Sequence, residues 1–163
     1  MDVSAAVADI FHAAYPRLVV HLYAVCGNQA DAEDAVQEAF TKALRNQKGF
    51  LGLDHPEAWL RTVALNHLRN GWRHHETVRR LRGKVPGPQS AFELGPDHVA
   101  IMTALAGLDR THREVVVLHY LVDLPVSEIA ATLGIAEGTV KSRLSRSRDR
   151  LAPLLAEEER EDA

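Results

Sequence analysis

Residues 125–151 read PVSEIAATLGIAEGTVKSRLSRSRDRL, and this stretch decides the fold of the second half of the chain. Its pattern predicts a helix, a turn at Leu133-Gly134-Ile135 and a second, arginine-rich helix. With about 100° between successive helical residues, one narrow stripe of the second helix groups four residues that can pack: Val140, Leu144, Ser147 and Leu151. Another side groups Thr139, Ser142, Arg143, Arg146 and Arg150. One side can pack while another stays free, which is the outline of a helix-turn-helix.

The residue types on the free side suit DNA. An α-helix fits the major groove, arginine can pair with guanine through two hydrogen bonds, and Ser or Thr can reach phosphates or base edges. The alternative is a basic helix that is merely solvated. Residues 127–134, SEIAATLG, favour the DNA interpretation because they supply the first helix and the turn.

Charge is strongly segregated along the 163 residues, although the net charge is only −3. Residues 61–90 carry a net charge of +6 and residues 138–151 carry +4, within an otherwise acidic chain. Basic blocks supply the counterion-release contribution to nucleic-acid binding. The acidic background argues against indiscriminate binding by the whole molecule, so we expect a partner to guide it.

The sequence predicts a cytoplasmic protein without membrane insertion. Its single cysteine, Cys26, cannot form an intramolecular disulfide, and the N-terminus lacks the basic start and apolar run of a signal peptide. No apolar stretch approaches the roughly 20 residues needed to span a bilayer.

Helical periodicity dominates, which predicts an all-α fold of two small helical domains joined by a flexible linker. We expect Pro16 to interrupt the first helical pattern and Gly27 to end the next helix. Further helices are predicted over residues 28–46, 56–73, 97–107 and 111–122. The expected domains are residues 1–82 and 97–156, with the Gly- and Pro-rich linker at 83–96 and a solvated acidic tail at 157–163.

The predicted 56–73 helix combines an aromatic residue with amide and basic groups. Asn66, Arg69, Asn70 and Arg73 repeat at helical spacing along one side, and Trp59 lies earlier on the same helix. Basic and aromatic groups together suit single strands, whose exposed bases stack or enter pockets. The alternative interpretation of Trp59 is that it is an ordinary core residue with no contact to nucleic acid.

Three motifs carry a family resemblance: DAEDAVQEAF at residues 31–40, AWLRTVALN at 58–66 and GTVKSRL at 138–144. In this order and spacing the chain resembles the extracytoplasmic-function (ECF) group of bacterial RNA polymerase sigma factors, from about Ile10 to Leu155. One departure is Ala136, which stands where the family often has a serine that caps the recognition helix.

The resemblance implies promoter DNA and core RNA polymerase as partners. It implies docking on the polymerase clamp helices through Asp34, Gln37 and Glu38. It implies capture of a flipped minus-ten base by the loop of Phe50, Leu51, Gly52, Leu53 and Asp54, with promoter melting assigned to Trp59 and Asn66 beside Arg69 and Asn70. It implies that the minus-35 duplex is read by Thr139, Lys141, Ser142, Arg143 and Arg146. Many relatives are also held inactive by an anti-sigma factor.

Two other classes of protein fit the sequence less well. A free-standing, homodimeric helix-turn-helix regulator explains the C-terminal half only. An enzyme is disfavoured, because the adjacent His74 and His75 do not have zinc-ligand spacing and no phosphate-binding glycine loop or nucleophile elbow occurs. We therefore expect no catalytic residue, no metal and no cofactor.

Overall fold

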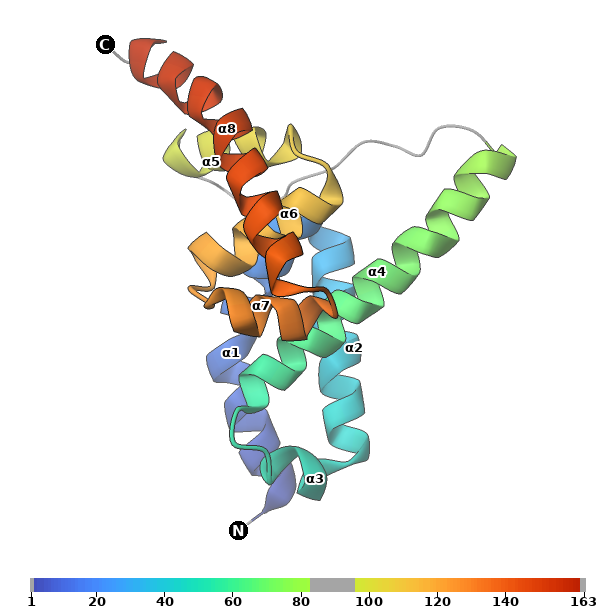
Figure 1. The fold of residues 1–163 in the computed structure, drawn as a ribbon. Helices are drawn as coiled ribbons and strands as arrows, with labels where there is room; N and C mark the ends of the chain where they lie inside the picture. Colours follow the sequence, from blue (N-terminus) through green and yellow to red (C-terminus); the bar gives the residue numbers. More distant parts are fainter. Residues whose placement is uncertain (1, 83–95, 162–163) are drawn as a thin grey trace. The chain divides into compact units, whose positions relative to one another are not determined.

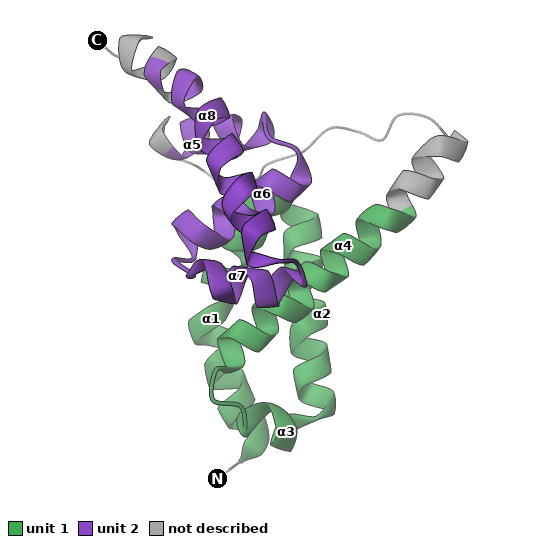
Figure 2. Cartoon of the chain, viewed as in Figure 1, with its two compact units in different colours: residues 1–90 green, residues 91–163 purple. Residues whose placement is uncertain are grey.

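The computed structural model describes residues 2–82 and 96–161, and all the regular secondary structure in these ranges is helical. The chain divides into two compact units, residues 1–90 and residues 91–163 (Figure 2). The division falls inside the predicted linker, of which residues 83–95 lie outside the described ranges, while Pro96 already begins a helix. The predicted all-α fold with two helical domains is confirmed. The domain limits at residues 82, 97 and 156 remain predictions.

The described part of unit 1 is built from α1 (Val3–Cys26), α2 (Gln29–Arg45), α3 (Gln47–Leu51) and α4 (Pro56–Arg82) (Figure 1). α1 and α2 lie side by side, and α4 packs against α2. The largest fully buried side chains of this core come from three helices: Val7, Leu18, Leu22, Val25, Val36, Leu60 and Leu65. The core therefore fixes the relative positions of α1, α2 and α4.

The helix predicted over residues 28–46 is confirmed as α2. The side-chain oxygen of Asn28 accepts a hydrogen bond from the backbone N–H of Asp31 at 3.0 Å and caps the helix. Gly27, before it, has φ 70°, the left-handed conformation predicted for the end of α1. The apolar side of α2 is buried at Ala32, Ala35, Val36, Ala39, Phe40 and Ala43. Leu44 continues this periodicity but is 48% exposed.

The expected interruption at Pro16 is wrong. α1 is continuous from Val3 to Cys26, with Pro16 inside it. Proline removes one backbone hydrogen bond and crowds the preceding turn. Ala14 and Leu18 on either side are buried, so packing of the helix outweighs this local cost.

α1 is, among the described residues, the one helix long and apolar enough to cross a membrane, judged by length and composition alone. Eight of its residues are buried within unit 1.

α4 is longer than the predicted helix that ends near Arg73, since it continues to Arg82. Gly71 does not break it, and no proline or further glycine occurs before Gly83. The arginines at 79, 80 and 82 extend the basic block in sequence, but their side chains lie outside the described residues.

The described part of unit 2 contains α5 (Pro96–Ala106), α6 (Arg110–Val116), the π-helical turn η1 (Val117–Leu121), α7 (Val126–Leu133) and α8 (Glu137–Glu161). The predicted helices at 97–107 and 111–122 are confirmed, the second one ending in η1. The predicted helix-turn-helix is also present. Gly134 makes its turn with φ 66°.

The predicted packing stripe of α8 is observed. Val140, Leu144 and Ser147 are buried and Leu151 is half-buried. The Ser147 hydroxyl donates to the carbonyl oxygen of Arg143 at 2.7 Å, which satisfies this polar group inside the core. α8 extends beyond Leu151 to Glu161, so the backbone of the predicted tail is helical through that residue.

Candidate nucleic-acid and polymerase interfaces

The short helix α3 shapes the loop that sequence analysis assigned to base capture. The side-chain oxygen of Asn46 accepts from the N–H of Gly49 at 3.2 Å and caps α3. A Cβ atom at Gly49 would meet the side chain of Asn46, so a larger residue here would displace the capping side chain. Phe50 and Leu51 therefore belong to a helix, whereas a loop was predicted.

Phe50 is only 3% exposed, and its ring centroid lies 5.6 Å from that of Trp59. The expectation that its side chain meets DNA directly does not fit this burial. Phe50 instead packs against the ring of Trp59. Trp59 is itself half-buried, so one part of its ring packs in the core and another part is accessible at the surface.

A cavity of about 160 Å³ opens beside these rings, and we call it the α3–α4 cavity. Its lining includes Lys42, Asn46, Phe50, Leu53 and Trp59. Leu53 is 38% exposed, and Gly52 and Asp54 beside it are also exposed, while Leu51 is half-buried. Sequence reasoning missed Lys42, which lies in the last turn of α2, and Asn46, which follows α2 and caps α3.

The polar side of α4 is available farther along the helix. Asn66 and Asn70 are exposed and Arg69 is half-buried, as expected for a solvent-facing stripe. None of these three residues lines the α3–α4 cavity. The structure thus brings Trp59 to the loop, and places Asn66 roughly two turns away on the same helix.

The start of α4 is anchored to α1 by an ion pair between Arg17 and Glu57. Arg17 donates from Nε and Nη2 to the two carboxylate oxygens of Glu57, at 2.8 and 2.6 Å. This hydrogen bonding holds the pKa of Glu57 below its usual value. Arg61, which is buried, lies 3.8 Å from the same carboxylate. Burial, with Arg61 nearby, lowers the pKa of His21 to about 4.

On α2, the residues assigned to polymerase docking lie on the side away from the core. Asp34 and Gln37 are exposed and Glu38 is half-buried. Oδ2 of Asp34 lies 3.0 Å from Nε2 of His67 on α4. Sequence reasoning missed this contact, which joins residues 33 positions apart.

The side of α8 assigned to base reading carries Thr139, Ser142, Arg143 and Arg146, which fall within about 100° around the helix axis. Ser142 and Arg146 are exposed, and Thr139 and Arg143 are half-buried. Lys141 is exposed but lies about 160° around the helix from Arg143. The structure therefore separates Lys141 from the other four assigned residues.

Arg150 is partly engaged elsewhere, since its Nη1 lies 4.0 Å from a carboxylate oxygen of Asp109. Asp109 caps α6 and accepts from the backbone N–H of His112 at 3.0 Å, and its Oδ1 lies 2.6 Å from Nδ1 of the same histidine. The side-chain contact, followed by the backbone one, holds the pKa of Asp109 well below its usual range. Among the described residues, no group of three or more His, Cys, Asp or Glu side chains could hold a metal ion.

A model of sigma-70 region 2 matches residues 10–78, and a model of sigma-70 region 4 matches residues 98–151. The ECF RNA polymerase sigma factor SigL of Mycobacterium tuberculosis is 36% identical over 126 residues, which cover 72% of this chain and 71% of SigL. The chain belongs to the ECF sigma factors.

Further relatives are also sigma factors. The RNA polymerase sigma factor CarQ of Myxococcus xanthus is 32% identical over 160 residues, covering 95% of this sigma factor and 92% of CarQ. The solved sigma factor RpoE of Bartonella quintana, in complex with the anti-sigma factor NepR, is 28% identical with a TM-score of 0.79, and the match covers 91% of this chain and 95% of that one. CnrH, solved with the cytosolic domain of CnrY, gives 25% identity and a TM-score of 0.64, covering 94% of this chain and 89% of CnrH.

As an ECF sigma factor, the chain works with core RNA polymerase at promoter DNA in transcription initiation. The alternative of a free-standing regulator is wrong. The region 2 match accounts for the N-terminal half, which that alternative left without a purpose.

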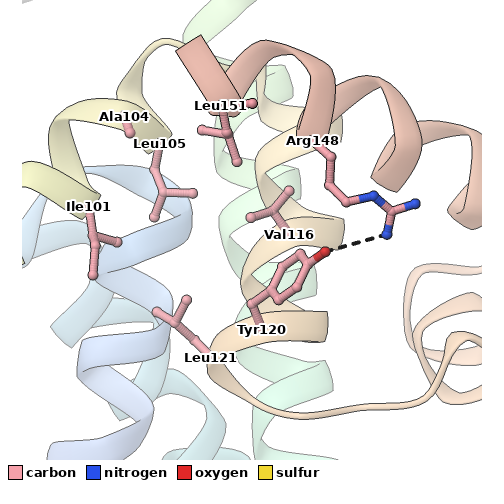
Figure 3. Close-up of a pocket in the computed structure, with 9 residues that line it drawn as sticks. Ile101, Ala104, Leu105, Val116, Tyr120, Leu121, Arg148 and Leu151 are labelled. Carbon is pink, nitrogen blue, oxygen red and sulfur yellow. Dashed lines mark hydrogen bonds between the residues drawn. The ribbon is translucent and has the colours of Figure 1, made fainter. Parts of the chain in front are cut away.

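The sigma factor also has an apolar groove in unit 2 that sequence reasoning missed (Figure 3). This unit 2 groove has a volume of about 640 Å³, and its lining residues are Ile101, Ala104, Leu105, Val116, Tyr120, Leu121, Arg148, Leu151 and Ala152. Tyr120 is 52% exposed although it follows the buried Val117 and Leu118. The π-helical turn η1 explains this, since a wider turn shifts the helical register that the sequence pattern assumes.

Arg148 belongs to this groove. Its Nη1 donates to the Tyr120 hydroxyl at 3.4 Å. On α8 it lies on the opposite side from the residues assigned to base reading. One cation of the basic block is therefore directed away from the side assigned to base reading.

Proposed function

We propose that unit 2 reads the minus-35 duplex with Thr139, Ser142, Arg143 and Arg146. The support is their shared side of α8 beside a helix-turn-helix whose other side is buried. Arginine can make two hydrogen bonds to guanine, and this gives base preference. Lys141, farther around the helix, contacts phosphate and contributes affinity without sequence preference.

We infer further that unit 1 captures a base of the melted minus-ten strand at the α3–α4 cavity. The observation that carries this proposal is the pairing of Phe50 with Trp59 beside an exposed Leu53. A fixed aromatic wall offers a stacking surface, and Lys42 at the rim suits a phosphate. Flipping a base costs a few kcal/mol, which a preformed pocket offsets better than a loop that must first be ordered. Asn66, Arg69 and Asn70 then hold the strand along α4.

The docking step assigns Asp34, Gln37 and Glu38 to the clamp helices of core RNA polymerase. Two carboxylates and an amide one turn apart on α2 suit a basic or polar helical partner. Phosphodiester chemistry stays with the polymerase in this account, and the sigma factor itself is neither an enzyme nor dependent on a cofactor. Its place of action is the cytoplasm, where polymerase and promoters are.

The proposal includes an anti-sigma factor as a second protein partner. The similarity to RpoE, which was solved bound to the anti-sigma factor NepR, supports it. Co-expression with candidate binding proteins and recovery of a stable inactive complex would test this part separately.

Crosslinking tests the strand-capture assignment directly. A photoreactive phenylalanine analogue in place of Leu53, in holoenzyme on a promoter with labelled strands, is expected to crosslink the non-template strand of the minus-ten element. The same analogue at Val20, which is 47% exposed on α1, is the control for exposure. Crosslinking of Leu53 and Val20 positions to the strand at equal efficiency would contradict the assignment.

A further inference from the structure

The contact between Asp34 and His67 ties the docking helix α2 to the strand-holding helix α4. Oδ2 of Asp34 and Nε2 of His67 are 3.0 Å apart, within hydrogen-bond distance. With its proton on Nε2, the imidazole donates to the carboxylate. We propose that His67 is a positioning residue for polymerase docking, because it holds the Asp34 carboxylate in the orientation that the polymerase binds. This inference rests on the proposed docking role of Asp34.

Because the side chain of Asp34 is largely exposed, it needs a partner such as His67 to fix its orientation. The side chain of Asp34 is 73% exposed, so without a partner it would sample several rotamers. Fixing a free side chain on binding costs conformational entropy, which preorganisation removes. His67 is 37% exposed and comes from a packed helix, so it can supply a fixed donor. Its side chain thus orders Asp34 before the partner arrives.

The second carboxylate oxygen of Asp34 is available for a contact with the polymerase. Oδ1 of Asp34 meets no hydrogen-bond donor among the described residues, while Oδ2 is held by His67. Docking would remove water from this pair, and a hydrogen bond to a charged group strengthens as the surroundings lose water. The contact is therefore worth more in the complex than in the free sigma factor, which is what a positioning residue needs.

Glu38 provides an internal comparison. It lies one helical turn after Asp34 on the same side of α2 and has the same assigned role, but among the described residues His67 forms its hydrogen bond with Asp34 and not with Glu38. An effect of His67 that passes through Asp34 should depend on Asp34 and not on Glu38. A general effect on folding or on the surface of α2 would not distinguish the two carboxylates.

Binding of full-length sigma factor to core RNA polymerase, measured by titration, tests the proposal. His67→Leu removes the donor and should weaken core binding by about 3- to 10-fold, the range expected for one hydrogen bond. His67→Gln keeps an amide donor and should restore part of the affinity. His55→Leu, at an exposed histidine in the loop before α4, should leave core binding unchanged.

Double variants decide whether the effect passes through Asp34. In an Asp34→Asn background, His67→Leu should cost little more, whereas in a Glu38→Gln background it should cost its full amount. Full additivity with Asp34→Asn, or no loss in His67→Leu while Asp34→Asn binds weakly, would overturn the positioning role and leave the docking proposal standing. Unchanged core binding in Asp34→Asn itself would overturn the docking role of Asp34 and this inference with it.

Discussion

Arg17 of α1 and Glu57 of α4 form a two-point ion pair, with both carboxylate oxygens bound at 2.8 and 2.6 Å. Glu57 lies in the first turn of α4, where a negative charge also favours the helix N-terminus. Trp59 follows two residues later. The ion pair therefore fixes the start of the helix that carries the aromatic wall of the α3–α4 cavity.

Glu57→Gln should destabilise unit 1 by about 1 kcal/mol, since the pair is two-pointed but partly exposed to water. The tryptophans, Trp59 and Trp72, both lie in α4, so fluorescence during denaturant unfolding reports on unit 1. Asp9→Asn, at an exposed carboxylate of α1, is the control and should change stability little. Equal stability of Glu57→Gln and wild type would show that this pair does not anchor α4.

His21 predicts a pH dependence of unit 1. Its pKa is lowered to about 4 by burial, with Arg61 adding to the effect and Glu57 opposing it. Between the unfolded value near 6.5 and the folded value, the unfolded chain binds more protons. Stability should therefore be fully present above about pH 6.5 and fall as the pH drops toward 4. His21→Phe should flatten this window in fluorescence-monitored unfolding, and an unchanged pH slope would contradict the assignment.

Glu57 contributes in a lower window. Its pKa is held below 4.5, chiefly by the hydrogen bonds from Arg17, so its contribution is present above the unfolded value and lost as the pH falls further. The two windows separate the histidine from the carboxylate. A His21→Phe variant should still lose stability below about pH 4.5, because this loss comes from Glu57. Glu57→Gln should make the same loss smaller.

A serine in place of Ala136 should stabilise α8. The N–H groups of Thr139 and Val140 donate to the Ala136 carbonyl at 3.0 and 3.2 Å, so Ala136 stands where a side-chain cap would act. A serine cap is worth about 1 kcal/mol. Thermal unfolding followed by circular dichroism should shift upward in Ala136→Ser. Ala131→Ser, exposed within α7, should give no gain, and equal shifts in both variants would remove the capping explanation.

The base-reading assignment separates Arg143 from Lys141. Arg143→Ala should cost about 1–3 kcal/mol and relax preference at one base position of the minus-35 element. Lys141→Ala should weaken binding evenly across sequences and reduce the salt dependence. Binding of holoenzyme to a set of single-base promoter variants measures both. Even losses on all sequences for Arg143→Ala would remove its base contact.

The periodicity of apolar residues correctly predicted the helices in which the 3.6-residue repeat is uninterrupted. The packed stripe of α8 and the buried side of α2 follow directly from 3.6-residue spacing. The same rule failed at Pro16, because core packing outweighed a local helix breaker, and at Phe50, because the Asn46 cap allows a short helix that contains Gly49. Neither the core packing around Pro16 nor the Asn46 cap can be read from the local sequence pattern.

Two features of the surfaces lay beyond sequence reasoning for different reasons. The unit 2 groove depends on the π-helical turn η1, which turns Tyr120 toward solvent out of the expected register. The Asp34 contact to His67 depends on how α4 packs against α2. Single-sequence patterns describe one helix at a time, so contacts between helices have to come from the three-dimensional structure.

Strand capture at the α3–α4 cavity should be needed only while the promoter is still duplex, so transcription from two templates tests it. Leu53→Ser and Asn66→Ala, both at exposed positions, are compared with the exposed-site control Val20→Ser on a duplex promoter and on the same promoter with a mismatched, pre-opened minus-ten segment. We expect normal core binding, a severe loss for both variants on the duplex, and partial recovery on the open template, where the cost of base flipping is already met. Equal defects on the two templates would contradict it, because the fault would then lie in binding or folding and not in holding the melted strand.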